Sequence, residues 1–184
     1  MLRAVLAAMG LGFGALVYSG AEKVPAAIEL PAQPQAQTFE DIALPMIARF
    51  EGKRNKAYQD VVGVWTICYG QTRGVSPGDF KTDAECEAQL RNEVQEYREG
   101  MHAYFTPETM AGRLPVTRDA AYTSLAFNVG IAGAGKSTAT KRLNAGDIAG
   151  GCEAIGWWNK AGGRVIRGLV LRRTEEVNLC LLDS

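Results

Sequence analysis

The sequence predicts a mostly helical α+β domain whose small amount of β structure comes early in the chain. Amphipathic helical patterns fill the second half, and one run rich in β-branched and aromatic residues lies between Ala57 and Gln71. The sequence contains no internal repeat. At 184 residues the chain is long enough for one domain with its own core and an accessory segment.

The first helix and the β segment carry clear periodic signals. Ala43, Ile47 and Phe50 recur at helical spacing. Pro45 predicts that this helix begins near it, because proline is tolerated only in the first turn. The run from Ala57 to Gln71 contains glycine turns between apolar residues, which predicts a short hairpin or a small sheet.

Two later helices have marked amphipathic patterns. A capping box at 82–85 opens a strong helix, with the predicted buried stripe Cys86, Leu90, Val94, Tyr97 and Met101. The last helix is expected to turn its apolar residues inward, namely Leu169, Val177, Cys180 and Leu181. Arg172 and Arg173 of that helix are expected to point outward.

Shorter elements lie between these two helices. Thr117 is expected to cap a helix that ends at Gly130, and Asp147 to cap a short helix after the turn at 144–146. The pair at 162–163, both glycine, interrupts the chain again.

Residues 4–21 form an uncharged, weakly apolar stretch between Arg3 and Glu22. Eighteen residues lie at the short limit for crossing a bilayer, and half of them are alanine or glycine. Three interpretations fit this segment: a cleavable signal peptide, a plain anchor, and a weakly held anchor that leaves the membrane. From the segment alone, cleavage after Ser19-x-Ala21 is favoured, and all three interpretations export the rest of the chain.

The segment 24–38 contains three prolines among alanines and glutamines, a composition typical of an extended linker. The compact domain is therefore expected over residues 39–184. Export makes disulfides the default for the four cysteines. Three pairings can be drawn, and we favour the short-range pairs Cys68–Cys86 and Cys152–Cys180.

The charged residues are unevenly distributed. Residues 39–110 carry 8 basic and 12 acidic side chains, whereas residues 111–184 carry 10 basic and 6 acidic ones. The positive second half suits a polyanionic partner such as cell wall, and equally a solvated face. No dense basic run with interleaved aromatics occurs, which argues against nucleic-acid binding. His102 and the four cysteines lack ligand spacing, so neither a metal site nor a cofactor is expected.

Two short motifs match the sequence patterns of known sites but lack the surrounding features that those sites require. The segment 130–137 fits the phosphate-loop pattern, but a helical pattern precedes it and only 47 residues follow it, too few for a nucleotide-binding sheet. The segment 74–78 fits the serine-hydrolase elbow, but Pro77 has no N–H to hold an oxyanion. We therefore expect neither nucleotide binding nor serine hydrolysis.

Glu51 and Asp60 are the carboxylates that we single out. Glu51 ends an apolar helical run, where partial burial favours the protonated form of a carboxyl group. Asp60 precedes the glycine turn of the predicted hairpin and is expected to be more open to water. Glycoside hydrolysis needs two such carboxylates, one to protonate the leaving oxygen and one to activate water or stabilise charge. Thr66 supplies a hydroxyl group on the returning strand that is suited to orienting a water molecule.

These residues lie within the pattern F-E-G-x4-A-Y-x-D-x2-G-x-W-T-I-x-Y-G-x-T, which runs from Phe50 to Thr72. Further characteristic segments follow at 118–130, 143–147 and 162–173. In this order, and over about residues 39–184, the chain resembles the phage-type lysozymes, the muramidases that act as endolysins. Because several separated motifs agree, the resemblance is specific.

The resemblance implies a lysozyme-like fold with a small early sheet and a helical C-terminal lobe. It also implies hydrolysis, with inversion, of the β-1,4 bond between N-acetylmuramic acid and N-acetylglucosamine in peptidoglycan by a monomer. Glu51 would be the general acid, and Asp60, helped by Thr66, would activate or position water. Gly70 would lie on the strand that lines the substrate cleft.

The sequence departs from the family's pattern at two places. Gln71 replaces a histidine that is often found after Tyr-Gly, so any support from that histidine is expected to be absent. The loop after Val129 usually carries an aromatic residue, and here the segment 134–136 has none.

The resemblance also changes the interpretation of the N-terminus. Some endolysins of this family carry an uncut signal-anchor-release segment, and the Gly/Ala-rich residues 1–23 now favour that interpretation over cleavage. Residues 4–21 would first hold the chain in the host's inner membrane, with the N-terminus cytoplasmic and the catalytic domain periplasmic. Release into the periplasm would then activate the enzyme. The alternative is a non-catalytic or anchored wall-binding protein on a lysozyme scaffold, for which one carboxylate should be lost, and both are present.

Overall fold

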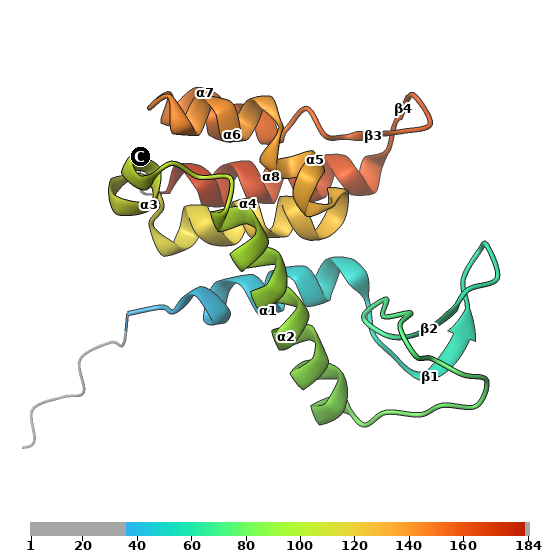
Figure 1. Cartoon of the computed structure of the whole chain (residues 1–184). Coiled ribbons are helices and arrows are strands. Elements are labelled where there is room, and N and C mark those ends of the chain that lie inside the picture. The colour runs from blue at the N-terminus through green and yellow to red at the C-terminus, as the bar shows by residue number, and fades with distance from the viewer. Residues whose placement is uncertain (1–35, 183–184) are drawn as a thin grey trace, which may run out of the picture. The chain divides into compact units, whose positions relative to one another are not determined.

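The computed structural model describes residues 36–182, which form a helical domain with a β-hairpin extending from one side (Figure 1). The predicted anchor at 1–23 and most of the predicted linker at 24–38 lie outside the described residues. Among the helices that the structure describes, none is both long and apolar enough to cross a membrane.

The described elements confirm the predicted mostly helical α+β class. They follow in the order α1 (Phe39–Glu51), β1 (Arg54–Gln59), β2 (Trp65–Cys68), α2 (Asp83–His102), α3 (Pro107–Gly112), α4 (Val116–Val129), α5 (Ile131–Gly135), α6 (Thr138–Asn144), α7 (Ile148–Ile155), β3 (Lys160–Ala161), β4 (Arg164–Val165) and α8 (Arg167–Leu181).

Helix α1 begins earlier than the sequence predicted. Thr38 and Asp41 form a capping box, in which each side chain accepts the other's backbone N–H, and this fixes the start at Phe39. Pro45 therefore lies inside the helix, where its missing N–H removes one backbone hydrogen bond. The prediction of a start near Pro45 was wrong because it took account of the proline and overlooked the cap.

The predicted hairpin is confirmed and begins at Arg54. Strands β1 and β2 pair antiparallel, with Tyr58 opposite Thr66, and an irregularity in the register lies between Arg54 and Tyr58. A second, very short hairpin of β3 and β4 was not predicted. Its turn consists of Gly162 and Gly163, which both have positive φ, the backbone conformation that glycine adopts without steric cost.

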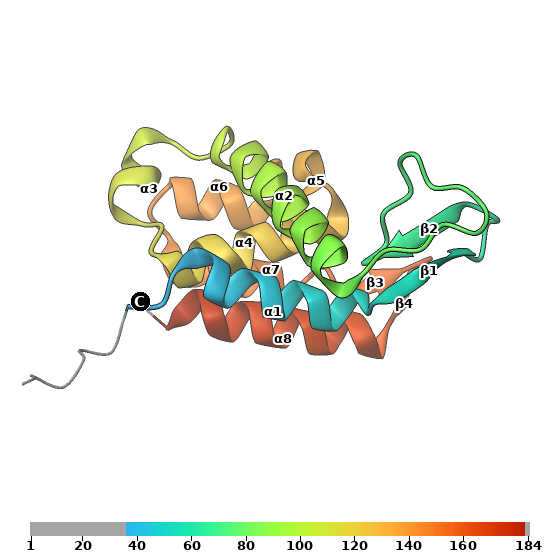
Figure 2. The same cartoon turned by 90° about the horizontal axis from the view of Figure 1, so that it is seen from below.

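Helix α4 is the central helix of the described domain, and Figure 2 shows it among the other helices. It packs against α1, α2, α5 and α8, and each of its residues from Arg118 to Ala126 is buried. The structure starts α4 at Val116, after Pro115, where the sequence predicted a cap by Thr117; its end at Gly130 agrees with the prediction. Because α4 precedes the segment 130–137, the geometry of a phosphate loop is not present there.

Two hydrophobic cores meet at α4. One core lies among the C-terminal helices and includes Met101, Tyr122, Leu125, Leu143 and Ile155. The other joins α1, β2 and the first half of α2, and includes Phe39, Ile47, Ile67, Leu90 and Val94. The second core places the end of α1 beside the hairpin, which is where the candidate site lies.

Two buried disulfides join neighbouring elements. Cys68, at the end of β2, is bonded to Cys86 in the first turns of α2. Cys152 of α7 is bonded to Cys180 of α8. These are the short-range pairs that the sequence favoured.

Candidate active site

A cavity of about 680 Å³ lies where the end of α1, the turn after β2 and the face of α2 meet. Its lining is mainly polar, with carboxylates, amides and one guanidinium beside two packed aromatic rings, Tyr97 and Phe127, whose centroids are 4.8 Å apart. The lining residues are Glu51, Tyr69, Gly70, Gln71, Thr72, Arg73, Gln89, Asn92, Glu93, Glu96, Tyr97, Phe127 and Ile131. Such a lining suits a polyhydroxylated ligand, since it combines many hydrogen-bonding groups with apolar ring faces.

Glu51 is the last residue of α1 and reaches this cavity. Its side chain is 24% exposed, which agrees with the partial burial that the sequence predicted. One carboxylate oxygen, Oε1, accepts a hydrogen bond of 2.7 Å from Nη1 of Arg172 in α8. Gly52 follows with a φ of 70°, so the chain leaves the helix abruptly and turns into β1. The acid candidate is thus held between a helix end and a cation.

The prediction that Arg172 and Arg173 point outward was wrong. Both are buried, at 3% and 1% exposure, because Glu176 of the same helix lies beneath them with no exposed surface. The ion pairs are short, with Arg172 Nε 3.2 Å and Arg173 Nε 2.9 Å from Glu176 oxygens. The available signal was the spacing Arg-Arg-x-x-Glu, which places the glutamate three and four residues further along the same helix face.

Asp60 and Thr66 lie together on the hairpin. Oδ1 of Asp60 accepts the backbone N–H groups of Val62 and Val64 at 3.0 and 2.8 Å, which fixes the carboxylate in the turn. The buried hydroxyl group of Thr66 donates to the carbonyl oxygen of Val64 at 3.0 Å. The cavity lining includes Glu51 and Gly70 but neither Asp60 nor Thr66. The roles of all four residues stay predictions.

Gly70 and Gln71 form the turn that follows β2 and lines the cavity. Gly70 has a φ of 101°, which side-chain-bearing residues rarely adopt. Gln71 is buried; its Oε1 accepts the N–H of Tyr69 at 2.9 Å, and its Nε2 donates to Glu93 of α2 at 2.8 Å. The family's histidine is absent here, as the sequence shows, but Gln71 supports the turn in its own way, because an amide can accept and donate at once and so join the turn to α2.

The protonation of the cavity wall is shifted by burial and by like charges. Burial raises the pKa of Glu93, although the hydrogen bond from Gln71 opposes this. Burial also raises the pKa of Tyr97, and the negative charges of Glu93, Glu51 and Glu96 raise it further. The α2 side of the cavity is therefore an acidic surface near the acid candidate.

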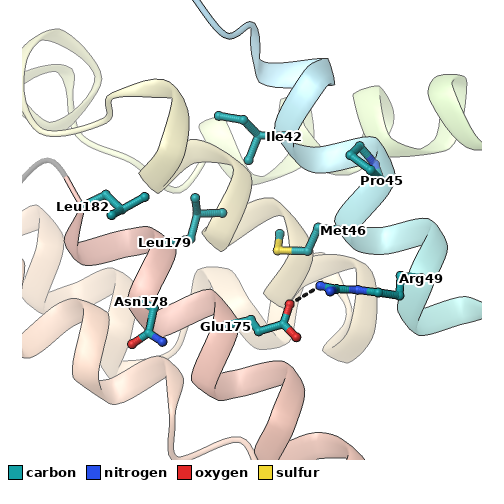
Figure 3. Close-up of a pocket in the computed structure, with 8 residues that line it drawn as sticks. All are labelled: Ile42, Pro45, Met46, Arg49, Glu175, Asn178, Leu179 and Leu182. Atoms are coloured by element: carbon teal, nitrogen blue, oxygen red, sulfur yellow. Dashed lines mark hydrogen bonds and ion pairs between the residues drawn. The ribbon is translucent and has the colours of Figure 1, made fainter.

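A second cavity of about 530 Å³ lies between α1 and α8 and has a different character (Figure 3). Apolar side chains form most of it, and its charged groups, Arg49 and Glu175, are paired with each other. It therefore offers no free acid or base. No cluster of His, Cys, Asp and Glu within residues 36–182 is arranged to hold a metal ion.

Comparison with known proteins shows the family of this chain. Residues 48–176 match the family model described as phage lysozyme. The SAR-endolysin of Bacteriophage PS119 is 38% identical over 132 residues, which is 71% of this chain and 76% of that protein. The SAR-endolysin of Enterobacteria phage P21 is 37% identical over 135 residues, covering 71% and 77%.

Solved structures show the same fold. The endolysin from Escherichia coli O157:H7 phage FAHEc1 has a TM-score of 0.69 at 28% identity, covering 82% of this chain and 97% of that one. The muramidase domain of SpmX from Asticaccaulis excentricus also has a TM-score of 0.69 at 28% identity, covering 79% and 99%. The family model spans the end of α1 with Glu51, the turn after β2 and helix α2 that line the cavity, and Arg172 of α8, and this chain therefore belongs to the phage lysozyme family.

Proposed function

We propose that this protein is an endolysin that hydrolyses the β-1,4 bond between N-acetylmuramic acid and N-acetylglucosamine in peptidoglycan and so lyses the host cell. The observation that carries the proposal is the partly buried Glu51 on a polar cavity of about 680 Å³ in a chain of the phage lysozyme family. The names of the relatives, SAR-endolysin and muramidase domain, support this function.

Glu51 is the general acid of the proposed reaction. In the structure its carboxyl group accepts a hydrogen bond from Arg172, and as general acid it donates a proton to the glycosidic oxygen. The developing positive charge on the sugar ring is then close to the acidic α2 wall of the cavity, which contains Glu93 and Glu96. Negative charge near an oxocarbenium-like transition state favours the reaction.

Asp60 is the proposed partner that activates or positions water, with Thr66 beside it. Oδ1 of Asp60 accepts both backbone N–H groups of the turn, which fixes the carboxylate. Oδ2 takes no part in these two hydrogen bonds. A water molecule held on this side attacks the face of the sugar opposite to the leaving group, which gives inversion. Gly70 is the proposed substrate-contacting position, because its lack of a side chain leaves the backbone accessible in the cavity.

Clearing of purified peptidoglycan in a zymogram tests this function. The wild type is expected to clear, and Glu51→Gln is expected to lose activity by about 10²–10⁴-fold, the usual contribution of a general acid. Glu153→Gln is the matched control, because Glu153 is an exposed glutamate on α7, away from the cavity lining. Clearing by a folded Glu51→Gln variant would refute the assignment. Binding of peptidoglycan by a wild type that never clears it would instead support a non-catalytic wall-binding protein.

We further propose that residues 4–21 export the chain as a weak signal-anchor and that release from the inner membrane activates the enzyme in the periplasm. The uncharged, Gly/Ala-rich composition of this segment and the SAR-endolysin names of the relatives support the proposal. Pulse-chase fractionation of the full-length chain tests it. Constant mass on passage from membrane to periplasm is expected, whereas a loss of about 2 kDa would indicate a cleaved signal peptide.

A further inference from the structure

A buried cluster of charges lies directly behind Glu51. The guanidinium group of Arg172 contacts two carboxylates, with Nη1 2.7 Å from Glu51 and Nε 3.2 Å from Glu176. Its Nη2 donates to the carbonyl oxygen of Ser124 in α4 at 3.1 Å. Three hydrogen bonds from one planar group fix the position and the plane of the guanidinium. One cation is therefore shared between a carboxylate on the cavity and a carboxylate in the core.

The core side of this cluster is closely paired, although the buried Nη1 of Arg173 makes no hydrogen bond within the described residues. Glu176, which has no exposed surface, accepts hydrogen bonds from the hydroxyl group of Ser124 at 2.6 Å and from Nη2 of Arg173 at 3.0 Å. Nε of Arg173 lies 2.9 Å from the other Glu176 oxygen. Arg173 also donates to Asn128 at 3.1 Å. Removing one charge from such a cluster leaves its partner buried without compensation, which is costly, so the cluster has one preferred arrangement.

We propose that Glu176 is a positioning residue for the proposed acid: by sharing Arg172 with Glu51, it orients the guanidinium and limits the positive charge that faces Glu51. The proposal rests on the proposed function, in which Glu51 acts in its protonated form. Glu176 itself does not reach the cavity lining, so it acts only through Arg172.

The charge balance of the cluster gives the direction of the effect. Arg172 and Arg173 contribute two positive charges and Glu176 one negative charge, which leaves a net charge of +1 beside Glu51. A nearby cation favours the ionised form of a carboxyl group, whereas a general acid must carry its proton. Glu176 therefore extends the active pH range of the enzyme in the alkaline direction.

Glu176 is the group whose own ionisation must be considered. Burial raises the pKa of Glu176, while Arg173, the hydrogen bond from Ser124 and Arg172 act in the opposite direction. The comparison is therefore made on the alkaline limb of the pH profile, because a rise in pH favours the ionised form of Glu176. The comparison measures how the negative charge of the buried Glu176 acts on Glu51 at short range in a low-dielectric environment.

The other charged and titratable groups near Glu51 stay the same in the Glu176 and Arg173 variants. Helix α2 contributes Glu93, Glu96 and Tyr97, and the turn after β2 contributes Arg73 and Tyr69. On α1, Arg49 is paired with Glu175 of α8 at the apolar cavity (Figure 3). A change in the pH profile is thus attributable to the substituted residue.

The test is the pH dependence of kcat/KM on purified peptidoglycan for four variants. Glu176→Gln raises the net charge of the cluster from +1 to +2 and is expected to move the alkaline limb down by about two pH units, as estimated for unit charges about 6 Å apart at an effective dielectric constant of about 20. Arg173→Gln is expected to move the limb upward by less than that. The double variant Arg173→Gln/Glu176→Gln restores the net charge and is expected to return the limb to the wild-type position.

Glu175→Gln is the matched control, because it makes the same chemical change one residue away at a half-exposed position. Its limb is expected to stay unchanged. If Glu176→Gln fails to fold, the upward shift of Arg173→Gln and the wild-type limb of the double variant decide the question.

Three results would overturn the proposal: an unmoved limb in folded Glu176→Gln, an equal shift in Glu175→Gln, or a double variant that shifts further than Glu176→Gln. The last result would indicate a purely structural role, because restoring the charge would not restore the profile. Failure of the proposed function is distinguishable, since it would show as full activity of Glu51→Gln. Loss of activity in Glu51→Gln with an unmoved limb in Glu176→Gln would refute the positioning role alone.

Discussion

The disulfide between Cys68 and Cys86 joins the cavity-lining turn to α2, and its removal tests whether that turn depends on it. The change is Cys68→Ala/Cys86→Ala, with Cys152→Ala/Cys180→Ala as the matched control. Both pairs are buried, and both join an element to a neighbouring helix. The two variants therefore remove the same kind of crosslink from two different parts of the domain.

The loss of stability follows from the loops that the disulfides close. Their sequence separations are 18 and 28 residues. The chain-entropy relation then gives about 3.2 kcal/mol for Cys68–Cys86 and about 3.6 kcal/mol for Cys152–Cys180 at 25 °C. Both variants are thus expected to lose a similar part of a total stability that is usually about 5–15 kcal/mol.

Activity is expected to separate the two variants. Cys68 has a φ of 56° and directly precedes Tyr69 and Gly70, which line the cavity. Without the crosslink, the turn still has the hydrogen bond from Gln71 to Glu93 as a side-chain connection to α2. Neither Cys152 nor Cys180 adjoins a lining residue. A lower kcat/KM is therefore expected for Cys68→Ala/Cys86→Ala only.

Urea unfolding measures the free energies, and kcat/KM on purified peptidoglycan is measured where both variants are fully folded. Equal losses of activity in the two variants would refute the reasoning, because the effect would then follow stability and not the position of the crosslink. A stability loss below about 1 kcal/mol in both would refute the entropic estimate.

Two further predictions concern stability. Burial raises the pKa of Glu93 above the ordinary value of 4.5, so the native state binds more protons than the unfolded state between 4.5 and that raised value. The free energy of unfolding therefore falls as pH rises through this interval, and Glu93→Gln is expected to remove that contribution in urea titrations at a series of pH values; an unchanged pH slope would contradict it. A methyl group added at Gly151 would lie 3.0 Å from the Tyr122 hydroxyl oxygen and 3.1 Å from backbone atoms of α6, so Gly151→Ala is expected to cost about 1–3 kcal/mol. Gly112→Ala, where nothing lies within 4 Å, is the control for thermal unfolding, and equal effects at the two glycines would contradict the packing argument.

Local signals in the sequence were sufficient for the elements whose ends are set by neighbouring residues. The capping box at Thr82 and Glu85 starts α2, and Asp147 caps α7 as predicted, because a side chain bonds to a backbone N–H three residues away. The hairpin follows from its alternation and its glycine turn. The disulfide pairs agree with the short-range preference because each joins elements that are close in the chain.

Features that depend on distant partners could not be obtained in this way. The spacing Arg-Arg-x-x-Glu indicates pairing with Glu176, but only the folded chain brings Ser124 and Glu51 to Arg172 from α4 and α1. The position of Glu51 at the end of an apolar helix was readable from the sequence, whereas its cation partner, 121 residues away, was not. In the same way, the support that Gln71 provides depends on Glu93 across the cavity wall.

The shared position of α4 has a consequence for how the domain unfolds. Ala120 belongs to the core of α1 and the hairpin, and its neighbour Ala121 belongs to the core of the C-terminal helices. If either core unfolds, α4 loses the packing on one of its faces, and the other core packs on the same helix. Heat or denaturant should therefore convert the described domain in one cooperative transition, without a state in which one lobe stays folded alone.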